Sequence, residues 1–354
     1  MSRLTLSLVG LSALVWASPL AAQTELTPEE LEAINNALQA DSADASPSPT
    51  PGPLAGASSS LSSMNPAIAL ILDSALAWYS EDDPRPTGGH DAAQNGFNFQ
   101  QLELSMGASV DPYFRLDSNI VFTLFGVEVE EAYLTTLALP GNLQVRAGQY
   151  LLPFGRINRT HPHTWSFADQ PLVIGKFFGG EGARGLGAEV SWLAPLPWFV
   201  ELVASVNNPA GECCTRSFAN DTIDGPEDFL YTLGLNQFFD LNEDWSITWG
   251  ISALLGPNDS GLDNRSEVYG TDLYVRYRPV ASAERMALSW QTEALYRTRQ
   301  VPGSRLEDWG LYSQLVWAIN ASWELGGRYD YVAGLSEDEL NPEWTEARQR
   351  EAVQ

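Results

Sequence analysis

The sequence contains little cysteine, lysine and histidine, and it has no long apolar run. Only two of its 354 residues are cysteines, Cys213 and Cys214, and two adjacent cysteines do not make a disulfide framework. Lys176 is the one lysine beside 18 arginines, so any basic site relies on the guanidinium group. No segment after the N-terminus reaches the roughly 18 consecutive apolar residues of a transmembrane helix. These absences exclude a disulfide-stapled domain and a helical membrane protein.

The chain is also short of positive charge. It carries 45 Asp and Glu against 19 Lys and Arg, which gives a formal net charge of -26 at pH 7. A protein that binds nucleic acid needs a basic surface to neutralise phosphates. Nucleic acid is therefore not expected as a partner.

The first 64 residues are predicted to lie outside the folded part. Residues 1–22 are typical of a signal peptide, with Arg3, an apolar run over 4–16 and small residues near Ala22. Residues 23–40 are predicted to form a short amphipathic helix capped by Thr27, which is either a marginal terminal helix or a small docking helix. Residues 41–64 are rich in Pro, Ser and Ala and predict a linker, so the folded part is expected over 65–354.

Apolar residues then recur at every second position over stretches of about ten residues. In "FRLDSNIVFTLF", for example, Phe114 and Leu116 alternate with Arg115 and Asp117. This period predicts strands with one apolar and one polar face. Thirteen strands are predicted, at 68–79, 97–110, 113–125, 127–139, 143–153, 184–194, 198–207, 228–239, 244–255, 268–278, 285–298, 308–319 and 321–333.

The strand pattern favours a membrane barrel over a secreted β-domain, which is the alternative. The strands are long enough to cross a bilayer when tilted, and aromatic residues gather near their ends. Short turns alternate with longer connections at 80–96, 154–183, 208–227, 256–267 and 299–307. The fold class predicted is an all-β transmembrane antiparallel β-barrel, with about 13 strands visible and 14–18 expected in a complete chain.

The end of the chain, "NPEWTEARQREAVQ", is polar and carries no predicted closing strand. Because single-chain bacterial barrels usually have an even number of strands, we expect the sequence to lack its last one to five strands. Residues 65–80 and 321–332 would then be unpaired edges. The alternative is a natural tail and a miscounted strand.

Several stretches resemble a known group of proteins. They are "NGFNFQQLELSMGASVDPYF", "VEVEEAYL", "LQVRAGQYLLPFGRINRTHPHTWSFADQPLV" and "GLGAEVSWLAP". Over residues 65–333 the chain resembles proteobacterial outer-membrane proteins labelled zinc-regulated TonB-dependent outer membrane receptors, and its architecture is similar to phosphate-selective porins of the O/P type. The resemblance implies a porin-like barrel and a link to metal supply. A chain of 354 residues cannot also hold the plug and 22-strand barrel of a TonB-dependent receptor, so that mechanism is not expected.

The polar phase of the strands predicts charges that line a pore. Both signs occur, so opposite charges can pair across the lumen, and the excess of acids predicts a weak cation preference. The candidates are Glu103, Arg115, Asp117, Glu128, Glu130, Arg146, Glu189, Glu201, Arg276, Arg278, Glu293, Glu324, Arg328 and Asp330.

Residues 154–183 form the longest connection and the third on the predicted outer side. The resemblance to porins implies that this loop folds inward and narrows the channel. The alternative is an outer loop packed against its neighbours. The charges that would line the constriction are Arg156, Arg159, Asp169, Lys176 and Glu181.

His161 and His163 lie two residues apart in the same loop, on either side of Pro162. This spacing puts both imidazoles on one side of an extended segment, where they would bind Zn²⁺ with His90 or Asp169 as a further ligand. A pair of histidines is a weak motif, and the alternative is that they pack and hydrogen-bond the loop in place. No other cofactor is expected.

The function predicted is a porin-like channel in the outer membrane of a Gram-negative bacterium, for passive diffusion of small hydrophilic solutes or ions. A metal-linked uptake receptor and a structural or adhesion barrel are the alternatives. The partners expected are membrane lipid, the solutes and, as in many porins, two further copies in a homotrimer. No catalytic motif occurs in the sequence, so an enzyme is not expected.

Overall fold

The computed structural model describes residues 7–8, 66–80, 87–211, 214–220, 222–280, 286–320, 322–334 and 348–353. The predicted signal peptide, helix and linker lie outside these residues, except for Ser7 and Leu8. No helix in the described ranges is long and apolar enough to cross a membrane.

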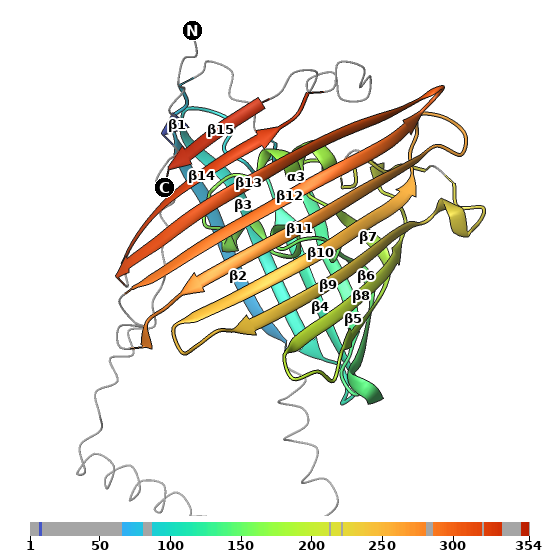
Figure 1. Ribbon diagram of the computed structural model, residues 1–354, viewed down its shortest axis with the longest axis horizontal. Coiled ribbons are helices and arrows are strands. Elements are labelled where there is room, and N and C mark those ends of the chain that lie inside the picture. The colour runs from blue at the N-terminus through green and yellow to red at the C-terminus, as the bar shows by residue number, and fades with distance from the viewer. Residues whose placement is uncertain are drawn as a thin grey trace, which may run out of the picture. The chain divides into compact units, whose positions relative to one another are not determined.

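The described chain is almost entirely β-structure (Figure 1). Its strands are β1 (Ser7–Leu8), β2 (Ala67–Ala77), β3 (Gly96–Ser109), β4 (Phe114–Phe122), β5 (Val127–Thr136), β6 (Leu143–Leu151), β7 (Arg184–Leu193), β8 (Phe199–Asn207), β9 (Leu230–Asp240), β10 (Trp245–Pro257), β11 (Arg265–Tyr277), β12 (Ala287–Val301), β13 (Ser304–Asn320), β14 (Trp323–Val332) and β15 (Arg348–Val353). The helical elements are η1 (Pro140–Asn142), η2 (Ile157–Arg159), η3 (Pro162–Thr164), α3 (Leu172–Phe178) and η5 (Pro226–Asp228).

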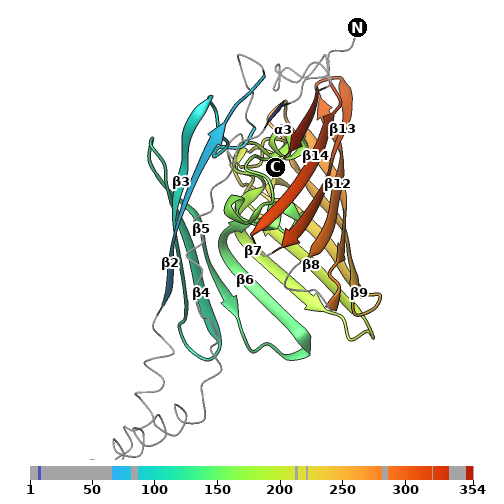
Figure 2. The same ribbon diagram turned by 90° about the vertical axis from the view of Figure 1, so that its left-hand side faces the viewer.

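The strands form one sheet in which each strand from β2 to β15 pairs antiparallel with its neighbours in sequence. The thirteen predicted strands correspond one to one to β2–β14, so the all-β antiparallel prediction is confirmed. The sheet curves so that β2 and β14 lie on opposite sides of a lumen (Figure 2). Among the described strands, β2 is an edge strand, and β1 pairs parallel with β15 at the other edge.

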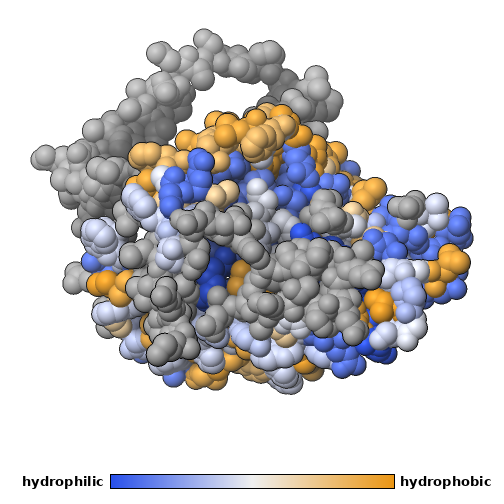
Figure 3. Space-filling view, turned by 90° about the horizontal axis from the view of Figure 1, so that it is seen from above, coloured by the Kyte–Doolittle hydropathy of each residue, from blue (hydrophilic) through white to orange (hydrophobic). Residues whose placement is uncertain are grey.

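The alternating pattern sorts side chains between the two faces of the sheet. On β14, Leu325 and Tyr329 are exposed on the outside, while Arg328 and Asp330 are buried inside. Seen from above, apolar residues form a band along the upper rim of the view with hydrophilic residues on its inner side, and both kinds occur along the other rims (Figure 3). An apolar exterior around a polar lumen is the arrangement of a transmembrane barrel, and the reverse of a soluble protein.

Two expectations about the last strands were wrong. The predicted long loop at 299–307 is instead a two-residue turn, because β12 and β13 pair as far as Val301 and Ser304. The end of the chain is not strandless, because β15 pairs with β14 from Val332–Arg348 to Gly327–Val353. β14 is therefore not an unpaired edge. Backbone pairing needs no apolar side chains, which explains why the polar end of the sequence gave no strand signal.

Candidate functional site inside the barrel

Residues 152–183 leave β6, cross the lumen and return to β7, and we call them the inner segment (Figures 1 and 2). The start of the inner segment is attached to the wall through Glu293 on β12. Its carboxylate accepts hydrogen bonds from the backbone N–H groups of Arg156 (3.2 Å) and Ile157 (2.7 Å) and from the Tyr312 hydroxyl (2.5 Å). Three donors on one buried carboxylate fix the start of the inner segment against β12 and β13.

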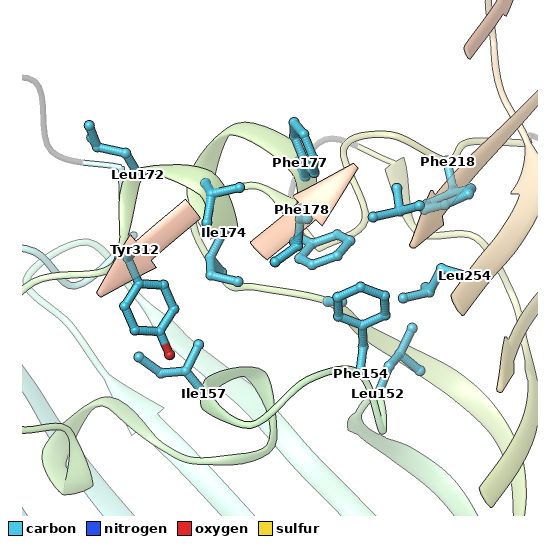
Figure 4. Close-up of a cluster of buried hydrophobic side chains, with 14 of the residues drawn as sticks. Leu152, Phe154, Ile157, Leu172, Ile174, Phe177, Phe178, Phe218, Leu254 and Tyr312 are labelled. Carbon is cyan, nitrogen blue, oxygen red and sulfur yellow. The ribbon is translucent and has the colours of Figure 1, made fainter. Parts of the chain in front are cut away.

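An apolar cluster holds the second half of the inner segment (Figure 4). Phe154, Ile174, Phe177 and Phe178 are fully or almost fully buried, and the Phe154 and Phe178 rings meet edge to face at 5.2 Å. They pack against inward side chains of the wall strands and against Phe218 of the β8–β9 connection. The wall side chains are Leu230, Leu254, Val268, Leu295, Tyr312 and Val332. The upper part of the inner face is therefore apolar where the inner segment covers it.

Ion pairs add two further attachments to the wall. Lys176 on α3 lies 2.7 Å from Asp308 on β13, which also accepts two hydrogen bonds of 2.9 Å from Arg297 on β12. Asp169 lies 2.8 Å from Arg328 on β14 and 2.9 Å from Arg350 on β15. Burial alone raises the pKa of Asp169, but the charges of the two arginines outweigh it and hold that pKa below its ordinary value.

The connection between β2 and β3 packs on the same segment. The backbone N–H of Gly89 donates to Gly180 O at 2.9 Å, and His90 Nε2 lies 3.2 Å from Glu181 Oε2. Burial lowers the pKa of His90, but the hydrogen bond and charge of Glu181 outweigh it and raise the pKa above its ordinary value. The two loops thus form one layer.

A β-bulge brings two adjacent glutamates into the lumen. Asn119 pairs with Glu131 and Ile120 with Val129, so Glu130 is the extra residue of β5 and both glutamates point inward. The turn of the inner segment that carries His161 lies against them. His161 Nδ1 is 3.0 Å from Glu130 Oε2, and its Nε2 is 2.8 Å from Glu131 Oε2.

Glu103 on β3 completes this group, which we call the His161 cluster: Glu103, Glu130, Glu131, His161 and His163. His163 Nδ1 lies 3.0 Å and His161 Nδ1 lies 3.8 Å from Glu103 Oε2. Burial lowers the pKa of His161, but its hydrogen bonds to Glu130 and Glu131 and their charges outweigh it and raise the pKa to about 10. Ligand atoms of Glu103, Glu130 and His161 all lie within 4.8 Å of one another, close enough to share one metal ion.

A cavity of about 700 Å³ lies on the inner side of β2–β8 beside this cluster. His161 and Glu131 form part of its wall. Its other charged wall residues are Arg115, Asp117, Arg146, Arg159, Glu189 and Glu201. The cavity is thus polar, and the inner segment borders it through Arg159 and His161.

The predicted pore charges have different surroundings. Five of them border the cavity, and others hold the inner segment or contact a neighbouring strand. Arg278 lies past the end of β11, and Glu324 is exposed near the start of β14. Glu128 pairs with Arg184 at the start of β7. Half-buried Arg276 lies on β11, in the same inward phase as Asp272.

The five constriction charges are held by partners. Arg159 lies 3.6 Å from Glu201, and the Arg156 guanidinium lies 3.8 Å from the centre of the Tyr274 ring. Asp169, Lys176 and Glu181 have the partners given above. The suggested extra ligands His90 and Asp169 were wrong, because each pairs with a different group: His90 with Glu181, and Asp169 with Arg328 and Arg350.

Sequence reasoning missed several residues that matter here. Glu131 is absent from the predicted pore charges, because strict alternation from Glu128 and Glu130 gives it the opposite face and the bulge at Glu130 reverses that phase. The run "VEVEEAYL", in which two acids interrupt the alternation, was the available signal. Arg297 and Asp308 share the inward phase of Glu293 and could have been found by extending the pattern. Arg350 lies in the strand that was not predicted.

Comparisons with known proteins give a limited context. No family model matches the chain. An uncharacterized protein of Aquifex aeolicus (strain VF5) is 35% identical over 306 residues, which are 75% of this chain and 64% of that protein. The chain therefore spans less than two thirds of the length of this relative.

Similar solved structures include forms of OmpT, an outer membrane protein of Vibrio cholerae. The in-vitro folded protein has a TM-score of 0.39 at 12% identity and covers 76% of this chain and 84% of its own. A loop L8 deletion mutant has a TM-score of 0.36 at 10% identity, covering 75% and 90%. Likenesses this weak carry no argument about function.

The properties of the sheet define the fold class of the chain. Its strands are antiparallel, its exterior is apolar and its lumen is polar and crossed by a fixed segment. This is an antiparallel transmembrane β-barrel fold.

Proposed function

We propose that this chain forms a porin-like channel in the outer membrane of a Gram-negative bacterium, through which small hydrophilic solutes or ions diffuse passively. The observation that carries the proposal is the polar cavity of about 700 Å³ inside an apolar exterior. The inner segment would set the width of the passage beside this cavity. Its buried contacts support a fixed constriction rather than a mobile lid.

The cavity charges suggest weak selectivity. Each wall arginine faces a carboxylate, which reduces the field that a passing ion meets. The pairs are Arg115–Asp117 at 2.7 Å, Arg146–Glu189 at 2.6 Å and Arg159–Glu201 at 3.6 Å. Glu131 adds a further acid beside His161. We therefore propose a weak cation preference.

Conductance across planar lipid bilayers tests the channel directly. The full chain, folded in detergent, should produce discrete current steps. Ser191 borders the cavity and its neighbour Val190 faces outward, so Ser191→Trp should reduce the step and Val190→Trp should leave it unchanged. Absence of steps at any voltage would contradict the proposal and favour a structural barrel with a filled lumen.

The reversal potential in a potassium chloride gradient tests the preference for cations. We expect a small reversal potential whose sign shows that K⁺ permeates more easily than chloride. Glu201→Gln leaves Arg159 in place and should shift the potential toward chloride. A wild-type channel that strongly prefers chloride would contradict this part of the proposal.

A further inference from the structure

The His161 cluster has the donor atoms of a transition-metal site. Nδ1 of His161 and carboxylate oxygens of Glu103 and Glu130 meet within 4.8 Å, and Nδ1 of His163 lies 3.0 Å from the same Glu103 oxygen. The donors come from three separate parts of the fold: β3, β5 and the inner segment. Two imidazoles with two carboxylates match the ligands of Zn²⁺ and its neighbours better than the all-oxygen sites of Ca²⁺ or Mg²⁺.

Glu131 supplies a second, separate feature of such sites. It lies 2.8 Å from Nε2 of His161, on the opposite side of the ring from Glu103 and Glu130. Its other oxygen accepts the backbone N–H of Leu151 at 2.8 Å, and its first oxygen accepts a hydrogen bond from Asn119 Nδ2 at 3.0 Å. A carboxylate on the far nitrogen fixes the tautomer and orientation of a metal-binding histidine.

The charge of the cluster also calls for a cation. Glu103, Glu130 and Glu131 are 1%, 3% and 5% exposed. Within the described residues, no lysine or arginine forms an ion pair with any of the three, and their ionic partners are the two imidazoles. Even two protonated histidines leave one negative charge in excess. Buried carboxylates are stabilised by a cation or by protonation, and a divalent ion supplies two charges at the point where the oxygens converge.

We propose that Glu103, Glu130 and His161, with His163 as the fourth donor, bind a divalent transition-metal ion of the zinc class, and that Glu131 orients His161. His161 and Glu131 border the cavity, which gives the ion a polar route to the site. The site joins the inner segment to β3 and β5, so a bound ion fixes the turn at 157–165 against the wall. This inference is independent of solute conduction.

Cobalt is the probe for this site because Zn²⁺ has no visible absorption. The full chain, folded in detergent and stripped with chelator, is titrated with Co²⁺. We expect one equivalent to give visible d–d bands and excess Zn²⁺ to remove them. His161→Ala should abolish the bands. Glu131→Gln leaves all four ligands in place and should weaken binding by about 10- to 100-fold, as expected for an orienting carboxylate.

His90→Ala is the matched control, because His90 also pairs with a glutamate, the partly buried Glu181, but belongs to no group of three possible ligands within the described residues. Each variant is first shown to be folded by its heat-modifiable migration in gels. Unchanged Co²⁺ bands in His161→Ala, or loss of the bands in His90→Ala, would overturn the site. Wild-type protein that binds no Co²⁺ would also overturn it, whatever its conductance. Equal affinity in Glu131→Gln and wild type would overturn the orienting role of Glu131.

Discussion

The Asp308 carboxylate forms ion pairs with two buried cations from different elements. Lys176 reaches it from α3 and Arg297 from β12, and the Lys176 and Asp308 side chains are 0% and 1% exposed. The attraction between such charges mainly offsets the cost of their desolvation. Removing one partner is therefore far more costly than the net value of the pair.

This imbalance predicts different effects for the two ends of the pair. Asp308→Asn removes the carboxylate from two buried cations and should destabilise the protein by about 3–5 kcal/mol. Lys176→Met keeps the Arg297–Asp308 pair and should cost clearly less. Urea unfolding in detergent, with proteolysis of residues 152–183 as a second readout, measures both. Equal costs would show that Asp308 is not the shared anchor.

Gly270 marks one of the places where the inner segment approaches the wall closely. A Cβ atom at this position would lie 2.6 Å from Cζ of Phe154, which is too close for any side chain. Gly270→Ala should therefore overpack the apolar cluster at a cost of about 1–3 kcal/mol. Phe154→Leu should recover part of this loss in the double variant. Gly126→Ala is the control, because its Cβ would meet no atom within 4 Å. If the destabilisations by Gly270→Ala and Phe154→Leu simply add in the double variant, the contact between Gly270 and Phe154 is contradicted.

Single residues also show where sequence reasoning stops. Alternation along one strand identifies the face of Arg328 or Asp330 without knowledge of its neighbours. It cannot reveal that Asp169 meets Arg328, because these residues are 159 positions apart and meet only across the lumen. The His161 cluster is similar, since its histidines were visible in the sequence but Glu131 depends on a bulge.

At the scale of elements, the strands were predictable and their connections were not. Strand signals are local, since each stretch alternates by itself. The turn at residues 302–303 and the pairing of β15 depend on backbone hydrogen bonds, which any side chain permits. The path of the inner segment depends on contacts with strands on both sides of the lumen, such as β5 and β12. Only the resemblance to porins implied that this connection turns inward.

The contact between the β2–β3 connection and the inner segment should depend on pH. His90 has a raised pKa, so its charged form stabilises the contact below its ordinary 6.5 and this stability is lost as pH rises through the raised value. For Glu181, burial raises the pKa, but the hydrogen bond and charge of His90 outweigh it and leave the pKa lowered. Its contribution is present above 4.5 and lost as pH falls through the lowered value.

The contact is therefore strongest between about 4.5 and 6.5 and weakens on both sides. Hydrogen exchange of the Gly89 amide, which donates to Gly180, measures the strength of this contact after correction for the intrinsic exchange rate. We expect protection to fall about tenfold at the alkaline limit. His90→Gln should remove the alkaline decrease while Glu128 and Glu130, the other charges that act on His90, stay in place. An unchanged pH profile in this variant would show that His90 does not cause the alkaline decrease in protection.

At the scale of the whole molecule, the sheet places its apolar face outward, and a segment of its own chain crosses its lumen. Neighbouring residues of β7 separate the two environments. Val190 is 41% exposed on the outer face, and Ser191 borders the cavity. The same charge added at these two positions therefore compares lipid with lumen at nearly the same depth.

Val190→Arg should lower the free energy of unfolding from lipid vesicles by up to about 2–4 kcal/mol, because the arginine meets hydrocarbon on the outer face of β7. Ser191→Arg should have a small effect, since the guanidinium enters a polar cavity beside carboxylates. Urea titrations of vesicle-inserted protein measure the difference. In detergent-free buffer a secreted β-domain would tolerate both substitutions alike. Equal losses of unfolding free energy for the two variants in vesicles would therefore contradict the membrane-facing exterior. A large loss for Val190→Arg alone is expected, because the period-two pattern of the sequence puts Val190 on the lipid face and Ser191 on the lumen face.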